Sequence, residues 1–256
     1  MLSGNKLNFL WLILTVLVFS ALVKLGFWQN GRALEKEQRL ARIEQLKSQN
    51  PLSLQQVNLL ATTENINDMP VVMEGVFDEK VVFLLDNQVN KGRLGYRAYQ
   101  VLIVEELAVL VNLGWVKGSI NRQEVPKIDA LLGKHIVRGN VRLIEVGIQL
   151  QEQVFSDVLW PLRVQQVELN KFSALINRQL LPFVVYVDKN EEIGFEKNWQ
   201  PIVMPPEKHR AYAFQWFSLA TAWLVLMIWA KFGGRKTSED SQNNNLKKSS
   251  PLKKEA

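Results

Sequence analysis

A histidine at the start of the last apolar segment carries the most distinctive chemistry in the chain. If that segment is helical, i+3 and i+4 spacing places three more residues on the face of His209: Tyr212, Ala213 and Trp216. A neutral imidazole beside aromatic surface can serve as an axial ligand of haem iron, and the Arg210 guanidinium can pair with a haem propionate. The same residues also suit a membrane interface, where His209 would hydrogen-bond lipid headgroups or the rest of the protein. The residues alone leave both interpretations open.

The chain lacks the short motifs of the common enzyme classes. It contains no G-x-S-x-G, no Walker A loop, no G-x-G-x-x-G and no H-E-x-x-H. Its only other histidine, His135, stands at the start of a β segment, where we expect a structural or exposed role. With no cysteine among 256 residues, disulfides, thiolate zinc sites and covalently attached c-type haem are excluded. We therefore expect a protein that is not an enzyme and holds no zinc.

Two apolar segments bracket the chain and are long enough to cross a bilayer. Residues 7–25 contain one charge, Lys24, and residues 211–230 contain none. A membrane-spanning helix needs about 20 apolar residues, so we predict transmembrane helices at 7–28 and 211–230. The first segment is longer than the apolar core of a cleaved signal peptide, and no A-x-A site follows it, which favours an uncleaved anchor. A buried core helix is the alternative for the second segment.

The net charge of +6 is concentrated at the ends of the chain. Residues 231–256 carry +4, whereas the long middle region is nearly neutral, which disfavours nucleic acid as a partner. Short basic tails stay in the cytoplasm, while long loops cross the membrane largely regardless of charge. We therefore expect residues 1–6 and 231–256 to be cytoplasmic and the domain at 29–210 to be extracytoplasmic. Four basic residues after the first span argue for the opposite orientation: Arg32, Lys36, Arg39 and Arg42.

The region between the spans changes from a helical to a β pattern. Residues 29–50 predict a helix that continues from the membrane and ends at Pro51. Ser53 is the expected N-cap of a short helix at 53–61. Runs rich in β-branched and aromatic residues predict strands at 71–77, 81–86, 96–104, 109–116, 135–144, 163–168 and 183–188.

The remaining segments read as turns, short helices and a tail. Asn90-Lys91-Gly92 predicts a turn, short helices are expected at 127–132 and 170–178, and the chain from Gly233 onward is expected to be disordered. Together these elements predict an α+β membrane protein whose N- and C-terminal transmembrane helices flank a β-rich, barrel-like domain. A mild polar stripe on the second span, and one small-x-x-x-small pair, suggest contact with the first span or with a partner: Gln215, Ser218 and Thr221, and Ser218 with Ala222.

Four motifs in order along the chain resemble the Surfeit locus protein 1 family of cytochrome c oxidase biogenesis factors. They are Gly26-Phe27-Trp28-Gln29-x-x-Arg32, Gly95-Tyr96-Arg97, Val111-Asn112-Leu113-Gly114-Trp115-Val116 and His209-x-x-Tyr212-Ala213-x-Gln215-Trp216-Phe217. Each motif is weak by itself, but their order and the two-span pattern together are fairly specific. The chain departs from the family pattern at Leu113, where Arg is usual, and at Lys208, where Asn is usual.

The resemblance implies an assembly factor of a bacterial inner membrane that helps to install haem in subunit I of a haem–copper terminal oxidase. It further implies that oxidase subunit I and haem-modifying membrane proteins are partners, that the central domain is periplasmic, and that haem a is a transient ligand. The family's proposed ligand, the histidine of the second span, corresponds to His209. Residues expected to line the haem site, or merely to anchor the helix ends, are Trp28, Gln29, Arg32, Arg210, Tyr212 and Trp216.

Composition adds a constraint on which metal is handled. Proteins that insert copper generally use soft ligands, but this chain has no cysteine and its five methionines show no paired spacing. We therefore expect a role on the haem side of oxidase assembly and no bound copper. Two alternatives are a membrane scaffold that binds oxidase subunit I without ligating haem, and an unrelated anchored protein of the cell envelope.

Overall fold

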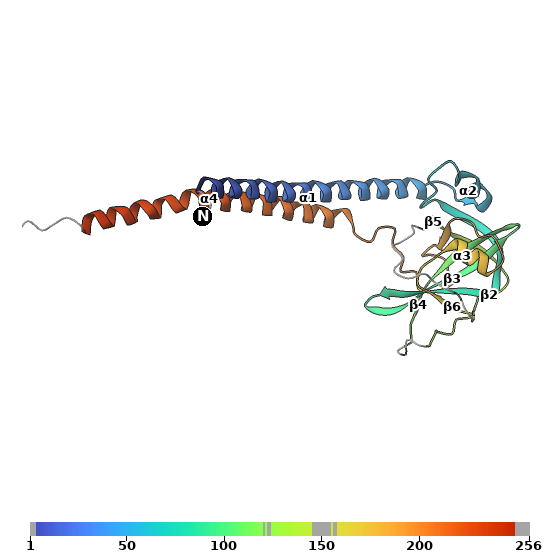
Figure 1. Ribbon diagram of the computed structural model, residues 1–256. Helices are drawn as coiled ribbons and strands as arrows, with labels where there is room; N and C mark the ends of the chain where they lie inside the picture. Colours follow the sequence, from blue (N-terminus) through green and yellow to red (C-terminus); the bar gives the residue numbers. More distant parts are fainter. Residues whose placement is uncertain (1–3, 120, 122–123, 145–154, 156–157, 249–256) are drawn as a thin grey trace, which may run out of the picture. The chain divides into compact units, whose positions relative to one another are not determined.

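The computed structural model describes residues 4–119, 121, 124–144, 155 and 158–248 (Figure 1). The chain divides into two compact units. One comprises Met1–Leu40 with Ile202–Ala256 and contains most of two long helices, and the other is Ala41–Pro201 and contains the sheet. Each unit is described by itself below.

Each long helix extends well beyond the predicted span. Helix α1 runs from Gly4 to Lys47 without a break, so the predicted first span and the helix predicted at 29–50 form one element. Helix α4 runs from Pro206 to Lys248. It therefore continues through most of the tail that we expected to be disordered from Gly233, because extending an existing helix costs far less than starting one. The predicted tail beyond Lys248 lies outside the described residues.

Both helices are long and apolar enough to cross a membrane. Large apolar side chains of each are exposed, among them Phe9 and Leu17 on α1 and Phe214 and Trp229 on α4. Exposed apolar residues in such numbers are unfavourable in water and favourable in lipid. The two helices thus fit a protein with two membrane spans.

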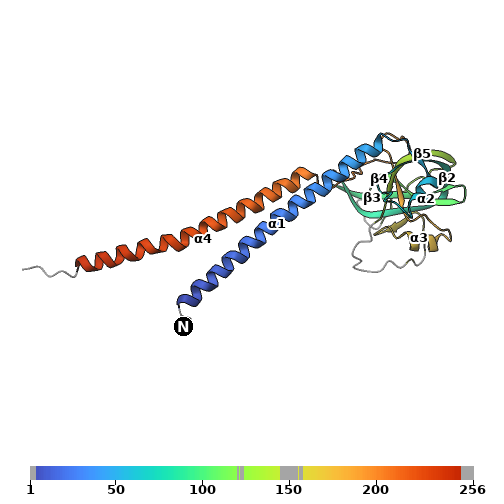
Figure 2. The ribbon, with the colours of Figure 1, turned by 90° about the horizontal axis from the view of Figure 1, so that it is seen from above.

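The two helices of the first unit contact each other through small residues. Ala33 of α1 and Ala213 and Ala220 of α4 are almost completely buried, at 1%, 4% and 2% exposure. A Cβ atom on Gly26 would lie 2.6 Å from Cε1 of Phe217, so a larger residue here would force the Phe217 ring to shift. Trp223 Nε1 donates to the Thr15 carbonyl at 3.2 Å across the same pair, which runs antiparallel (Figure 2). Small residues allow helix backbones to approach closely.

The contact face of α4 differs from the predicted polar stripe. Gln215, Ser218, Thr221 and Ala222 are all exposed, so the stripe does not face α1. Residues of α4 that approach α1 follow a spacing of three and four instead, which is typical of a coiled-coil seam: His209, Ala213, Phe217, Ala220 and Trp223. Contact of this stripe with a partner protein stays a prediction.

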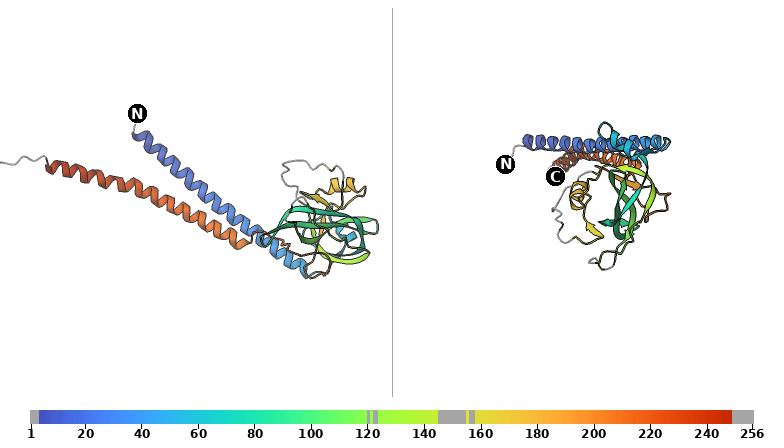
Figure 3. Two further views of the ribbon diagram at one scale, coloured as in Figure 1. Left: turned by 90° about the horizontal axis from the view of Figure 1, so that it is seen from below. Right: turned by 90° about the vertical axis from the view of Figure 1, so that its right-hand side faces the viewer.

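The second unit contains a curved sheet (Figure 3). Its strands, within the described residues, are β1 (Leu52–Ser53), β2 (Pro70–Asn90), β3 (Arg93–Val104), β4 (Leu107–Lys117), β5 (Lys134–Arg142), β6 (Leu162–Val164) and β7 (Val184–Val187). Their order is β1-β2-β3-β4-β7-β5, β6 pairs with β2, and β2 also pairs with β5. Hydrogen bonding therefore runs in a closed circuit through β2, β3, β4, β7 and β5, which is the kind of closure that a barrel-like domain requires.

The strand predictions hold for most of the sheet, but two predicted segments form one strand and β1 was not predicted. Segments predicted at 71–77 and 81–86 form a single strand, β2, whose pairing with β3 is irregular between Phe77 and Val82. Asp78 accounts for the difference, because its carboxylate accepts from the backbone N–H groups of Lys80 and Val81 and bends the strand without ending it. The segment predicted at 163–168 is strand only at β6, Leu162–Val164.

The turn predicted at Asn90-Lys91-Gly92 is confirmed, and the helical turn predicted at 127–132 is not. Asn90 pairs with Arg93, and Lys91 and Gly92 form a two-residue turn with φ of 48° and 75°. Positive φ at both positions is typical of a type I′ hairpin turn, which Gly92 adopts without strain. The helical turn predicted at 127–132 is wrong, since that segment has no regular secondary structure. A side chain from the sheet holds part of it in place: both the N–H and the carbonyl of Leu131 are hydrogen-bonded to the buried Gln100 amide.

Two short helices cover parts of the sheet. Helix α2 (Leu54–Leu60) begins with the predicted Ser53 cap, which forms a complete capping box with Gln56. Its buried residues, Leu54 and Val57, pack in a core cluster that also contains Val109 of β4 and Val137 of β5. Helix α3 (Leu169–Leu175) is the helix predicted at 170–178. Its Phe172 stacks on Phe83 of β2, with ring centroids 4.0 Å apart, and both belong to a second core cluster of the sheet unit.

Candidate functional site

His209 lies in the first turns of α4 and is buried against α1. Its side chain is only 8% exposed, and its Nδ1 atom is 2.8 Å from Oε1 of Gln29. Ala33 and Ala213 leave room for this contact because neither has a side chain beyond Cβ. The hydrogen bond joins residues 180 positions apart in the sequence and is one of the polar contacts between the two helices.

The hydrogen bond to Gln29 determines which ring nitrogen carries the proton. An amide oxygen only accepts, so His209 Nδ1–H donates and Nε2 of the neutral ring keeps its lone pair. A histidine that ligates a metal usually donates its second ring N–H to an oxygen in this way. The free lone pair on Nε2 and the hydrogen-bonded Nδ1 therefore give His209 the pattern of an axial ligand of haem iron. Its low exposure means that part of the helix contact would have to open before a large planar ligand reached Nε2.

The two arginines near this histidine are already paired with carboxylates. Arg210 Nη2 lies 2.7 Å from Oε1 of Glu37 and links α4 to α1, and Arg32 Nη1 lies 2.7 Å from Oε2 of Glu35 within α1. Both arginine side chains are substantially exposed, at 59% and 43%. An exposed arginine can exchange its glutamate partner for another carboxylate at little cost in free energy, so Arg210 or Arg32 could pair with a haem propionate.

The aromatic residues predicted to line the site are more exposed than His209. Trp28 and Tyr212 are 56% and 45% exposed, and Trp216 is intermediate. The aromatic contact within the helix pair is made instead by Phe27 and Phe217, edge to face with ring centroids 5.3 Å apart. Exposed tryptophan and tyrosine near the end of an apolar helix are typical of the membrane–water interface.

The structure thus brings together some of the predicted site residues and adds others. Gln29 contacts His209 directly, whereas Arg210 pairs with a residue that the sequence did not single out, Glu37. No local pattern could have identified Glu37, because it is one of several charges on a solvated helix. Whether His209 ligates haem stays a prediction.

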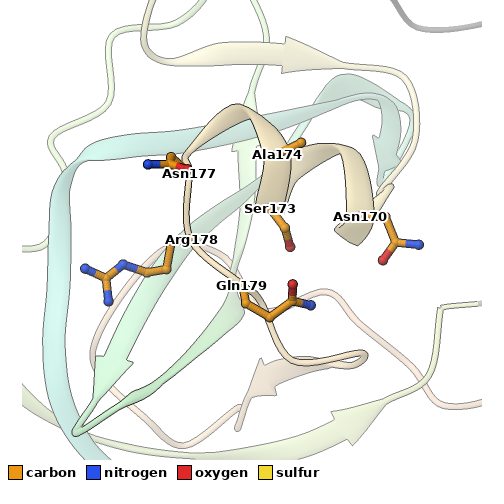
Figure 4. A pocket seen from close by; sticks show the side chains of 6 residues that line it. All are labelled: Asn170, Ser173, Ala174, Asn177, Arg178 and Gln179. Atoms are coloured by element: carbon orange, nitrogen blue, oxygen red, sulfur yellow. The ribbon is translucent and has the colours of Figure 1, made fainter.

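Two hollows lie among the described residues of the sheet unit, and His209 lines neither of them. The smaller, about 380 Å³, lies beside α3 (Figure 4) and is lined by Asn170, Ser173, Ala174, Asn177, Arg178 and Gln179. Its Ser173 hydroxyl donates to the Leu169 carbonyl and accepts from the Leu180 N–H, so it is not poised as a nucleophile. The larger hollow, about 680 Å³, lies against Tyr99 and Tyr186. Among the described residues no group of three or more His, Asp or Glu side chains is arranged to hold a metal ion.

Comparison with known proteins supports the resemblance seen in the motifs. No curated protein matches the chain. A sequence model of the SURF1 family, however, matches residues 16–221, which include most of α1, the whole sheet unit and the start of α4 with His209. The match covers well over half of the chain, and on this ground the protein belongs to the SURF1 family.

Proposed function

We propose that this protein is a membrane-anchored assembly factor for a haem–copper terminal oxidase and assists the insertion of haem into subunit I. The family to which it belongs is known for cytochrome oxidase assembly. The observation that carries the proposal is the extent of the family match, which includes parts of both apolar helices as well as the sheet unit between them. The same match leaves no support for an unrelated anchored envelope protein.

The proposed location is a bacterial inner membrane, with α1 and α4 as its two spans. Their exposed apolar surfaces support this placement. The basic tail after the second apolar segment supports a cytoplasmic position for both termini, which leaves the sheet unit in the periplasm. In this orientation His209 and Gln29 lie near the periplasmic end of the helix pair.

His209 is the proposed contact with the haem cargo. The Gln29 oxygen accepts the Nδ1 proton, so Nε2 would be the atom through which His209 holds haem iron. Arg210 and Arg32 would exchange Glu37 and Glu35 for the propionates. Haem bound in this way would be held by one weak axial ligand and released readily to subunit I, as a transient carrier requires.

A second function, a scaffold that binds oxidase subunit I without ligating haem, is supported by a different observation. His209 is 8% exposed and already hydrogen-bonded, and Arg210 is already paired, so each side chain has a structural role within the helix pair. A scaffold would use the exposed surfaces of the helices and leave this contact closed.

A strain lacking the gene separates these functions. Complementation with the wild type should restore oxidase activity and haem a content of the membranes, whereas His209→Ala should restore neither if haem contact is required. The visible spectrum of the purified full chain, expressed in cells that make haem a, should show haem in the wild type and lose it in His209→Ala. His135→Ala is the matched control, because it removes the other histidine from an unrelated place in the sheet unit.

The outcomes are distinct. Normal assembly by a haem-free His209→Ala protein, with subunit I still crosslinked to it, would establish the scaffold and reject haem ligation. Normal oxidase activity and haem content in the deletion strain would reject both functions.

A further inference from the structure

The larger hollow of the sheet unit has the size and lining of a small-molecule site. Its volume of about 680 Å³ lies in the range of about 300–1,000 Å³ that ligand pockets occupy. The lining combines five apolar residues, Leu85, Ile144, Val167, Leu169 and Pro182, with eight that carry polar groups. The polar residues include Tyr99 and Tyr186, whose rings bear hydroxyls, and also Glu168 and Lys171, which pair with each other.

Beside the Tyr186 ring, although not among the residues that line the hollow, lies an arginine that forms no ion pair with a described residue. Arg97 of β3 is partly buried, and its Cζ atom lies 5.6 Å from the centroid of the Tyr186 ring. Its Nε atom is buried without a hydrogen-bond partner, and no carboxylate in the described part of the chain forms an ion pair with it. A buried donor without an acceptor and a partly buried charge without a partner are both unfavourable. Proteins tolerate such groups mainly where a ligand completes them.

The neighbouring charges are neutralised in pairs. Arg142, which also lies near the Tyr186 ring, is bonded to Asp68 at 2.8 Å, and Lys171 at the pocket is bonded to Glu168 at 3.0 Å. Among these three described cations, Arg97 is therefore the one without a carboxylate partner.

The two tyrosines supply a further donor. Tyr99 and Tyr186 hydroxyl oxygens are 3.3 Å apart, and one hydrogen bond between them uses only one of their two protons. Burial, and next the nearby Tyr186, raise the pKa of the Tyr99 hydroxyl well above its ordinary value, although Arg97 opposes the shift. The Tyr99 hydroxyl thus keeps its proton at neutral pH, and the hydroxyl pair has one O–H left to donate to a ligand.

We propose that this pocket binds an organic acid with an apolar body, whose carboxylate accepts from the free tyrosine O–H and is neutralised by Arg97. One unpaired guanidinium matches one negative charge and the two-oxygen geometry of a carboxylate. A phosphate dianion would need a second free cation, and the other two near the pocket are paired. The apolar lining accommodates the body of the acid. This binding activity is separate from the proposed oxidase assembly function and does not depend on it.

Equilibrium dialysis of the full chain in lipid nanodiscs tests the proposal. The probe is naphthalene-2-carboxylate, its neutral comparison is naphthalene-2-carboxamide, and empty nanodiscs measure uptake by the lipid. Wild-type protein should bind the carboxylate about tenfold more tightly than the amide, because a hydrogen bond to a charged group is roughly twice as strong as a neutral one. Arg97→Gln should remove this preference, and Tyr186→Phe should reduce it.

The matched control is Arg138→Gln, which removes an arginine that is 57% exposed on β5 and should bind the carboxylate like the wild type. Equal binding of carboxylate and amide by the wild type would overturn the proposal without any variant, so it stays testable even if Arg97→Gln does not fold. Absence of carboxylate binding, or unchanged binding by a folded Arg97→Gln protein, would overturn it as well.

Discussion

His209 and Gln29 place a hydrogen bond between side chains inside a helix contact that is built largely from glycine, alanine and aromatic residues. A polar group in such a place is favourable only while its partner is present, since the alternative is an unpaired N–H in an apolar contact. The contact thus has a structural role whether or not haem ever reaches Nε2. The effect of this hydrogen bond on stability can therefore be measured separately from any contact of His209 with haem.

Replacement of Gln29 by leucine should weaken the helix pair. The His209 Nδ1–H loses its acceptor, and the expected cost is about 1–3 kcal/mol. Unfolding of the full chain in mixed micelles by added sodium dodecyl sulfate, followed by circular dichroism, measures it. Gln215→Leu is the matched control, because Gln215 is an exposed glutamine of α4 and its loss should cost nothing measurable. Equal stability of the two variants would show that the Gln29 contact is unimportant.

Asp188 should make the stability of the protein depend on pH. Burial raises the pKa of its carboxyl above the ordinary 3.8, although a hydrogen bond from Asn140 opposes the shift. The folded state therefore holds the proton more tightly than the unfolded state. The contribution of Asp188 to stability falls as pH rises from about 3.8 through the folded pKa, and is constant above it.

The variant Asp188→Asn removes this fall. The difference in melting temperature between the variant and the wild type should change in favour of the variant as pH rises from acid to neutral. Melting curves of the full chain at a series of pH values measure that difference, in which the effects of all other titrating groups cancel. A difference that stays constant with pH, or changes in favour of the wild type, would contradict the raised pKa.

At the scale of elements, closure of the sheet depends on close backbone approach between β5 and β7. A Cβ atom at Gly139 would lie 2.4 Å from the Tyr186 carbonyl oxygen, and backbone cannot move aside as a side-chain end can. Gly139→Ala should therefore destabilise the protein by about 1–3 kcal/mol. Thermal unfolding followed by near-ultraviolet circular dichroism measures it, with the neighbouring Arg138→Ala as the control. If both variants melt alike, β5 and β7 are not packed this closely.

The sequence predicted most of the elements because their signals are local. Apolar length identified both long helices, Ser53 indicated the start of α2, and Asn90-Lys91-Gly92 indicated a turn. The error at 127–132 arose where a distant residue decides the structure. Gln100 bonds the backbone of Leu131 from 31 positions away, and a helix-like local pattern carries no trace of that bond.

The candidate site divides in the same way. Residue type and position in the apolar segment are local, and they were enough to select His209. Its burial and its partner are not local, because they depend on how α1 and α4 pair across 180 positions. The unpaired guanidinium of Arg97 was also hidden, since the sequence shows a charge but not the lack of a counter-ion.

At the scale of the whole molecule, the absence of cysteine allows the membrane orientation to be tested without background labelling. Leu59→Cys introduces a thiol at a residue of α2 that is 76% exposed, and Thr237→Cys introduces one in the tail beyond the second apolar segment. A membrane-impermeant maleimide should label Leu59→Cys in intact spheroplasts and Thr237→Cys only after permeabilisation. The reverse pattern would show that the basic residues after the first span determine the orientation.

The order of strands in the sheet has a consequence for biosynthesis. Strand β7 lies between β4 and β5, although it is the last strand of the sheet to be made. Until residue 187 has left the ribosome, β4 and β5 each have an open edge that another chain could join. A transcript that stops between these strands would therefore yield an aggregation-prone product in place of a smaller folded domain.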